Sequence, residues 1–180
     1  MKLIETKNYD ELSRVAADML ISEIKAKPNC VLGLATGSTP IGTYDKLIEA
    51  YKSNEVSFAK VKSINLDEYV GISWSNTESY RYFMNEHLFD HVDIDKTNTH
   101  VPNGLAGDLD EECARYDALY DRIGPVDIQV LGIGLNGHIG FNEPGTSLSA
   151  PTHIVKLSDS TRQANSRNFT SLDAVPYKAI

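Results

Sequence analysis

Positions 126–145 carry the stretch VDIQVLGIGLNGHIGFNEPG, which decides the fold more than any other part of the chain. Its first six residues, Val126 to Leu131, form an apolar run that predicts a buried strand. Five glycines, His138 and Glu143 follow at the carboxyl end of that strand. Ligands of open parallel sheets bind outside such ends, and glycine-dense turns let backbone approach a substrate closely. The stretch therefore predicts a functional loop at the edge of an α/β sheet.

The same loop contains the spacing Gly132-x-Gly134-x-x-Gly137, which matches the dinucleotide-binding fingerprint. That fingerprint also requires a helix that opens at the third glycine. Here the chain continues through residues 138–145 to Pro144 and Gly145, which cannot continue a helix. We therefore expect no nicotinamide cofactor.

Outward from this loop, helical and strand patterns alternate along the chain. Apolar residues at helical spacing predict helices, and short apolar runs bounded by turn residues predict strands. The expected helices cover 10–27, 40–51, 77–89, 110–122 and part of 158–169, and the expected strands cover 30–35, 61–66, 126–131, 152–157 and residues from 175 onward. This alternation predicts an α/β fold with an open, mostly parallel, Rossmann-like sheet and helices on both faces.

Composition limits the class of protein. A chain of 180 residues with 41% hydrophobic content fits a single domain over residues 1–180. We expect no membrane span and no signal peptide, because no apolar run approaches 18 residues and no basic leader precedes one. The net charge of −8 argues against nucleic acid as a partner. With Cys30 and Cys113 expected as buried free thiols, these features predict a cytoplasmic domain.

The turn Thr36-Gly37-Ser38-Thr39 joins an expected strand to a helix that begins at Pro40. Free N–H groups and the dipole at a helix N-terminus attract anions, so this turn is a candidate phosphate site. An ordinary β–α turn in which Thr39 caps the helix explains the same residues. Spacing alone leaves the two interpretations open.

Two further groups of titratable residues lie at the same edge of the sheet. Asp67-Glu68 closes an expected strand, and a buried carboxylate there could abstract a proton from carbon. A solvated acidic turn is the alternative. His138 and Glu143 form an acid–base pair in which a carboxylate orients an imidazole. Metal ligation by this pair is a second interpretation, but no third ligand stands at a usual zinc spacing.

Basic residues complete the candidates. Arg162 and Arg167 follow an expected strand, and either could hold a phosphate with two hydrogen bonds, although a solvated helix face is favoured for Arg162. His87 and His91 are spaced as metal ligands on a helix, but packing and a favourable interaction with the helix C-terminus are the better explanation.

Four blocks of this chain resemble, in the same order, those of the glucosamine-6-phosphate deaminase family. The blocks are ATGSTP at 35–40, NLDEY at 65–69, LGIG with GHIGFNEP over 131–144, and TRQANSR at 161–167. The GHIGFNEP block is the most specific. The 6-phosphogluconolactonases share the fold and a similar first turn, but they usually lack the FNEP continuation.

The resemblance implies that the chain converts glucosamine 6-phosphate and water to fructose 6-phosphate and ammonia, without metal or organic cofactor. His138, held by Glu143 and Asn136, would open the sugar ring, and Asp67 would move a proton from C2 to C1. The family's phosphate-binding positions match Thr36, Gly37, Ser38, Thr39 and Arg167.

The chain also departs from the family's pattern. Asn136 stands where many members have Asp, and it orients a histidine without lending the same charge. The family's C-terminal strand–helix segment, which includes a phosphate-binding lysine, is expected to be missing here. The basic residues of a regulatory site known in some hexameric members are replaced by His153 and Val155, so no allosteric activator is expected. Whether the protein is a monomer or a homo-oligomer is left open.

Two other functions remain compatible with these residues. A sugar-phosphate lactonase would use neither proton abstraction at C2 nor loss of an amine. A sugar-phosphate-binding module without catalysis would explain a missing C-terminal segment, but the acid–base residues Asp67, His138 and Glu143 are all present.

Overall fold

The computed structural model describes residues 2–134 and 136–180. Its central parallel sheet has the strand order β3-β2-β1-β4, formed by β1 (Val31–Leu34), β2 (Lys62–Asn65), β3 (Thr99–His100) and β4 (Ile128–Gln129). β2 and β4 both pair with β1, on opposite sides. The connections that leave β1 and β4 therefore diverge at a topological switch point, where open α/β sheets bind ligands.

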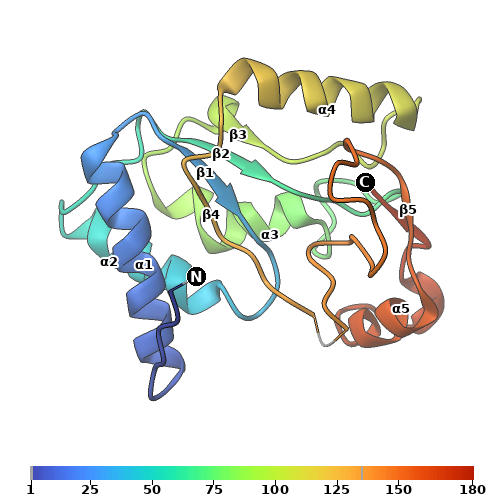
Figure 1. Cartoon of the computed structure of the whole chain (residues 1–180), viewed down its shortest axis with the longest axis horizontal. Helices are drawn as coiled ribbons and strands as arrows, with labels where there is room; N and C mark the ends of the chain where they lie inside the picture. The colour runs from blue at the N-terminus through green and yellow to red at the C-terminus, as the bar shows by residue number, and fades with distance from the viewer. Residues whose placement is uncertain (1, 135) are drawn as a thin grey trace.

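Helices cover both faces of this sheet (Figure 1). α1, α2 and α3 pack against one face, and α4 covers the other. Their bounds are Tyr9–Ala26 for α1, Ile41–Lys52 for α2, Tyr80–His87 for α3, Leu109–Ile123 for α4 and Asp159–Asn165 for α5. The expected open, mostly parallel sheet between two layers of helices is confirmed.

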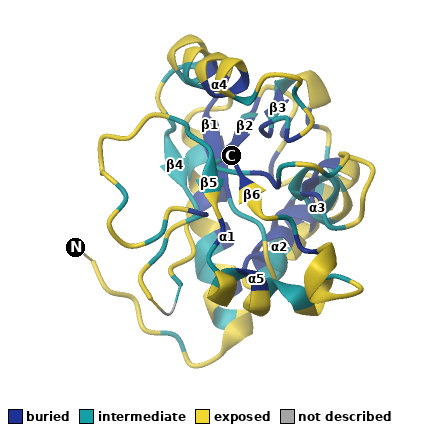
Figure 2. Cartoon of the chain, turned by 90° about the vertical axis from the view of Figure 1, so that its right-hand side faces the viewer, coloured by how far each residue is buried: buried dark blue, intermediate teal, exposed yellow. Residues whose placement is uncertain are grey.

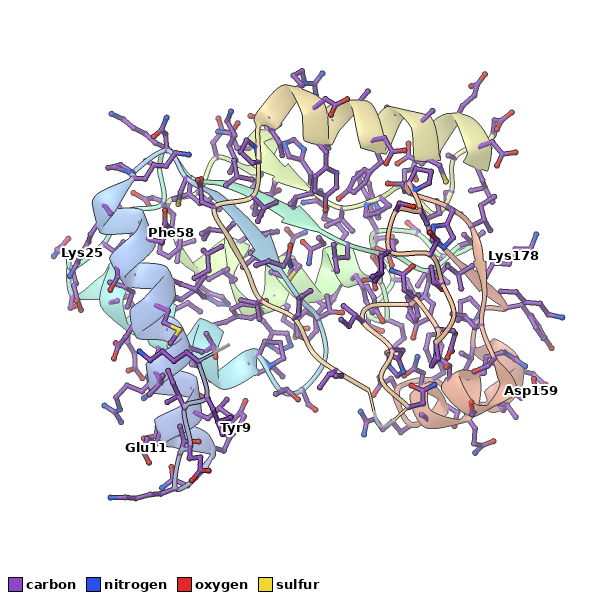
Figure 3. The ribbon with its side chains drawn as sticks, in the orientation of Figure 1. Tyr9, Glu11, Lys25, Phe58, Asp159 and Lys178 are labelled. Atoms are coloured by element: carbon purple, nitrogen blue, oxygen red, sulfur yellow. The ribbon has the colours of Figure 1, made fainter. Side chains whose placement is uncertain are left out.

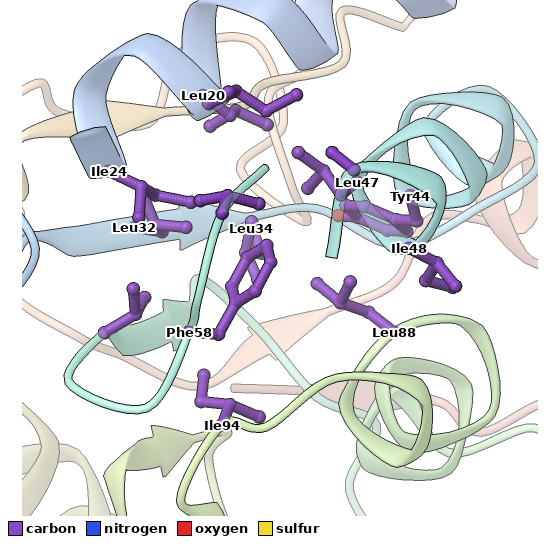
Figure 4. Packing of buried hydrophobic residues seen from close by; sticks show 14 of the residues in the cluster. Leu20, Ile24, Leu32, Leu34, Tyr44, Leu47, Ile48, Phe58, Leu88 and Ile94 are labelled. Atoms are coloured by element: carbon purple, nitrogen blue, oxygen red, sulfur yellow. The ribbon is translucent and has the colours of Figure 1, made fainter. Parts of the chain in front are cut away.

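The hydrophobic core follows from the alternation of side chains along β1. Leu32 and Leu34 point toward the α1–α3 layer, where Leu20, Leu47 and Phe58 surround them (Figure 4). Val31 points the other way and packs with Tyr116 and Leu119 of α4. The central strands are thus covered on both faces, as the burial colours of Figure 2 show. Cys30 and Cys113 are buried free thiols, as expected.

Two local expectations were wrong. Within 126–131 only Ile128–Gln129 forms a strand, and this segment is half-buried rather than buried, with Leu131 50% exposed. The reason is its place at the edge of the sheet, where it pairs only with β1. Thr39 does not cap α2, because Pro40 occupies the cap position and no side chain caps this helix.

The last strands lie outside the parallel sheet. β5 (Val155–Lys156) pairs antiparallel with β6 (Lys178–Ala179), whereas the sequence predicted longer strands at 152–157 and from 175. The backbone of Ile180 exchanges two hydrogen bonds of 3.0 Å with the backbone of Glu68. The chain after β6 therefore lies beside the segment that follows β2. β3 was not predicted, since two residues carry no readable pattern. No helix in the described part of the chain is long and apolar enough to cross a bilayer.

Candidate active site

A cleft of about 570 Å³ opens at the carboxyl ends of β1, β2 and β4. The turn after β1, Asp67 after β2, and the glycine-rich loop after β4 all line it. Arg167, which follows α5, closes a further side. Figure 1 shows why these segments meet: the loop after β4 runs from the end of the sheet toward α5. All the residues predicted for the site line this cleft except Asn136 and Glu143.

Asn136 and Glu143 lie behind the cleft and hold His138. Nδ1 of His138 lies 2.6 Å from Oδ1 of Asn136, and Nδ2 of Asn136 donates to Oε2 of Glu143 over 3.0 Å. Glu143 also accepts hydrogen bonds from Thr161 at 2.6 Å and Ser158 at 3.0 Å, both near the start of α5. The sequence predicted that Glu143 would orient His138, and the structure links the two through Asn136.

This series of hydrogen bonds determines which ring nitrogen of His138 faces Asn136 as a donor. The hydrogen bond from Thr161, followed by those from Ser158 and Asn136, keeps the pKa of Glu143 below its ordinary value, so this side chain is an ionised acceptor. The amide of Asn136 must therefore turn its NH₂ toward Glu143 and its oxygen toward His138. In the neutral imidazole of His138, Nδ1 then carries the proton and Nε2 carries the lone pair. His138 is thus prepared to act as a base.

Asp67 rests on the same glycine-rich loop. A Cβ atom at Gly140 would lie 2.7 Å from Oδ2 of Asp67, and Gly140 has a φ of +60°, so this close approach requires glycine. Burial of the carboxyl group, reinforced by the neighbouring charge of Glu68, raises the pKa of Asp67 to about 7. A hydrogen bond from the backbone N–H of Phe141 offsets part of this rise. A carboxylate with such a pKa is suited to proton abstraction near neutral pH.

Glu68 does not lie in a solvated acidic turn, because its side chain is fully buried. It accepts hydrogen bonds from the hydroxyl of Ser79 at 2.8 Å and from the backbone N–H groups of Tyr80 and Arg81 at 3.0 and 3.1 Å. The N–H of Tyr69 donates to it as well, at 2.9 Å. Glu68 therefore joins the end of β2 to the start of α3, a role that the sequence did not reveal.

Aromatic packing holds these segments together. The ring of Tyr69, next to Glu68, lies 5.1 Å from those of Tyr80 and Phe141 and 5.5 Å from that of Phe169. These rings come from the segment after β2, from α3, from the glycine-rich loop and from the segment after α5. Such contacts keep the loop that carries His138 in a fixed position relative to Asp67.

The opposite end of the cleft carries polar groups suited to an anion. Thr36, Gly37, Ser38 and Thr39 line it with Arg167, which is exposed. The hydroxyl of Tyr9 lies 2.9 Å from the carbonyl oxygen of Thr39 and accepts the N–H of Gly42 at 2.9 Å. Figure 3 shows Tyr9 beside the start of α2. Tyr9 thus fixes this turn, although nothing in the sequence pattern indicated it.

Arg162 was expected on a solvated helix face and is instead buried, with 6% of its surface exposed. Its guanidinium donates to the carbonyl oxygens of Leu172 and Val175 and stacks on Tyr177 at 3.7 Å. Arg162 therefore supports the chain after α5, and Arg167 is left as the arginine that faces the cleft.

His87, at the end of α3, and His91, in the 3-10 turn that follows, both contact groups of this part of the chain. His87 packs its ring against Phe83 at 4.4 Å, and Nε2 of His91 lies 2.7 Å from the carbonyl oxygen of Glu86. Over residues 2–134 and 136–180, no three His, Cys, Asp or Glu side chains are grouped so that they could hold a metal ion.

Comparison with known proteins agrees with this geometry. Residues 5–173 match the family described as glucosamine-6-phosphate isomerases/6-phosphogluconolactonase. The whole chain is 56% identical to a glucosamine-6-phosphate deaminase of Geobacillus sp. and 58% identical to one of Clostridium perfringens, and it covers 72% and 74% of their lengths.

Solved structures separate the deaminases from the lactonases. A monomeric glucosamine-6-phosphate deaminase is 51% identical, with a TM-score of 0.97 over 99% of this chain and 74% of that one. A 6-phosphogluconolactonase from Thermotoga maritima is 20% identical, with a TM-score of 0.69 over 89% of this chain and 72% of the other, and so shares the fold alone. Together with the arrangement of Asp67, His138 and Glu143, these matches show that the chain belongs to the glucosamine-6-phosphate deaminase family.

Proposed function

We propose that this protein is a glucosamine-6-phosphate deaminase, which converts glucosamine 6-phosphate and water to fructose 6-phosphate and ammonia. The observation that carries the proposal is the placement of two different bases in one cleft. His138, fixed through Asn136 and Glu143, supplies one, and Asp67 with its raised pKa supplies the other. Ring opening and carbon acid chemistry need separate proton acceptors, and this cleft provides both.

Ring opening is the first step. Nε2 of His138 takes the proton of the C1 hydroxyl, the bond from C1 to the ring oxygen breaks, and His138 delivers the same proton to the ring oxygen. The product is the open-chain amino aldehyde. Because Asn136 accepts a hydrogen bond from Nδ1, Nε2 is the nitrogen that exchanges the proton with the substrate.

Asp67 acts in the second step. Its carboxylate takes the proton from C2 while O1 receives a proton from the ammonium group at C2, which gives an enolamine. Asp67 then returns its proton to C1. C2 then carries an imine, water adds to it, and ammonia leaves as the C2 carbonyl of fructose 6-phosphate forms. Atoms balance with one water consumed and one ammonia released, and no group outside the cleft is needed for proton transfer.

The sugar phosphate would be held at the other end of the cleft. Thr36, Gly37, Ser38 and Thr39 offer hydroxyl and backbone N–H donors, and Arg167 supplies a cation. Binding energy from a phosphate that does not react positions C2 over Asp67. We expect Arg167→Gln to raise KM by about tenfold or more, the usual loss for a hydrogen bond to a charged group, with a much smaller change in kcat.

The deciding experiment measures ammonia and fructose 6-phosphate released from glucosamine 6-phosphate by this chain. Equal amounts of both products, abolished in Asp67→Asn, would support the proposal. Circular dichroism of both proteins controls for folding. A folded wild-type chain that releases no ammonia but hydrolyses 6-phosphogluconolactone would instead assign the lactonase reaction.

We also propose that the protein acts in the cytoplasm on its small phosphorylated substrate. The two cysteines are free rather than paired, which is typical of proteins from a reducing compartment. Recovery of activity in the cytosolic fraction of lysed cells, and not in the membrane fraction, would test this placement.

A further inference from the structure

A second pocket, of about 550 Å³, opens at the β3 edge of the sheet beneath α4. Its polar and aromatic lining comes from Trp74, Arg81, Lys96, His100, Arg115 and Tyr116. Among the described residues, this pocket shares no lining side chain with the active-site cleft, and no Asp or Glu lines it. Nothing in the proposed reaction uses it.

Arg81 is the most unusual group in this pocket. Its guanidinium donates to Oγ1 of Thr99 at 2.7 Å and to the carbonyl oxygen of Thr99 at 2.8 Å. Its Nε atom is buried and has no hydrogen-bond partner within residues 2–134 and 136–180. Since a guanidinium carries five N–H donors, this cation keeps unused donors in a partly desolvated place. The Arg81 side chain is half-buried, and no carboxylate of residues 2–134 and 136–180 accepts a hydrogen bond from its guanidinium, although charges taken out of water are normally paired.

Glu68 is the acidic residue that contacts Arg81, but hydrogen bonds from other groups already occupy its carboxylate. Glu68 accepts the backbone N–H of Arg81 at 3.1 Å and three further donors, and none of these is the guanidinium. Burial lowers the pKa of Arg81, and Tyr116, followed by Glu68, only partly opposes this effect. The guanidinium therefore remains a cation with a deficit of negative charge around it.

Trp74 and Thr99 hold this cation rigidly. The guanidinium carbon lies 5.0 Å above the centre of the Trp74 ring, and Nε1 of Trp74 donates to the carbonyl oxygen of Pro102 at 3.3 Å. Trp74 is still 43% exposed, so the stacked pair faces the pocket from the surface. A fixed guanidinium loses little freedom when it binds an anion.

Other charges around the pocket are positive as well. Lys96 is paired with Asp90 and Arg115 with Glu112, but neither of these acids lines the pocket. The pKa of His100 is lowered first by burial and then by Arg81, Arg122, Arg115 and Lys62. Among the residues that the structure describes, the lining of this pocket thus holds basic side chains and no carboxylate, in a chain with a net charge of −8.

We propose that this pocket binds a small oxyanion of the phosphate class, with Arg81 as its anchor and Arg115 at its rim. A tetrahedral oxyanion offers several acceptors to the fixed donors of Arg81 and a counter-charge to its cation. The volume suits a small molecule, and the net negative charge of the whole chain opposes a long polyanion. This site is independent of the deaminase reaction.

Trp74 makes the test specific, because it is the only tryptophan of the chain. Inorganic phosphate is titrated into the full chain at constant ionic strength while tryptophan emission is followed. We expect a saturable change, with an apparent affinity at least about tenfold weaker in Arg81→Gln. Arg14→Gln is the matched control, since Arg14 is an exposed arginine of α1 paired with Asp10. Arg167→Gln, in the active-site cleft, should leave the titration unchanged.

A second variant covers the chance that Arg81→Gln unfolds the β3 edge. Arg115→Gln keeps both bonds from Arg81 to Thr99, and it should weaken binding while circular dichroism stays unchanged. Methyl phosphate titrated beside inorganic phosphate distinguishes an ester ligand from the free ion, and binding of either supports the site. The proposal is overturned if phosphate gives no saturable change and equilibrium dialysis of Arg167→Gln finds none bound. An emission change that both pocket variants retain in full overturns it as well.

Discussion

Gly140 is the residue on which the position of Asp67 depends. Alanine at this position would place a Cβ 2.7 Å from Oδ2 of Asp67 and would have to adopt a φ of +60°. We predict that Gly140→Ala lowers kcat about 100-fold, because displacement of a catalytic group by about 1 Å has such an effect. The strained backbone should cost about 1 kcal/mol of stability as well.

Steady-state kinetics tests this prediction, and Gly107→Ala is the matched control. A Cβ at Gly107 meets nothing within 4 Å, so that variant should keep wild-type kcat. Wild-type kcat in a folded Gly140→Ala protein would show that Asp67 does not need this contact.

Asp67 also makes the fold less stable at the pH where it works. Its pKa rises from 3.8 to about 7 on folding, so between these values the folded state holds a proton that the unfolded chain has released. Stability therefore falls as pH rises through this window and levels off above about pH 7. The ionised carboxylate, which the proposed proton abstraction requires, is the less stable form.

Replacement of this carboxyl by a neutral group should reverse the effect. We predict that Asp67→Asn is inactive yet more stable than wild type at pH 8, by on the order of 1–2 kcal/mol, with no gain at pH 3. Urea unfolding at both values measures the difference. Equal or lower stability of Asp67→Asn at pH 8 would contradict the burial of this carboxyl.

At the scale of elements, α3 and the catalytic base are coupled through Glu68. The pKa of Asp67 is raised first by burial and second by the negative charge of Glu68. A neutral residue at position 68 removes the second of these causes. We predict that Glu68→Gln moves the acid limb of the profile of kcat/KM against pH below 7. Ser79→Ala removes one hydrogen bond to Glu68 and keeps its charge, so it should lower stability by about 1 kcal/mol without that shift. A purely structural role for Glu68 would lower activity with no change in the profile.

His153 and Val155, just before and at the start of β5, stand at the positions that match a regulatory site. His153 lies 2.7 Å from the carbonyl oxygen of Pro151 through its Nδ1, and Val155 pairs with Ala179 of β6. Neither is an arginine or a lysine, the side chains suited to hold a phosphate. We predict equal rates with and without N-acetylglucosamine 6-phosphate at subsaturating glucosamine 6-phosphate, and strong activation would contradict this.

How well an element was predicted depended on its length. α1 and α4 agree with the predicted helices to within one residue at each end, because several turns of apolar residues define a period. β3, β5 and β6 are two residues long, and partners distant in sequence decide where they form. The boundaries of β4 were wrong for the same reason, since pairing with β1 rather than local composition sets them.

At the scale of the whole molecule, the sequence indicated which loops meet but not how they touch. Parallel strands bring their carboxyl ends together, so Asp67, His138 and the turn at 36–39 were expected at one edge. The order of contact from Glu143 through Asn136 to His138 depends on side-chain directions that spacing does not encode. The burial of Glu68 and Arg162 depends equally on distant partners.

The register of β4 has a consequence for how the protein comes to be active. Ile128 pairs with Leu32 across 96 positions (128 − 32 = 96), whereas β1 and β2 are neighbours along the chain. Closing so long a segment is slow compared with forming local contacts. Helical signal should therefore return early on dilution from urea, and turnover should return only with the later docking of β4. A folded but inactive form would therefore precede the active enzyme during refolding.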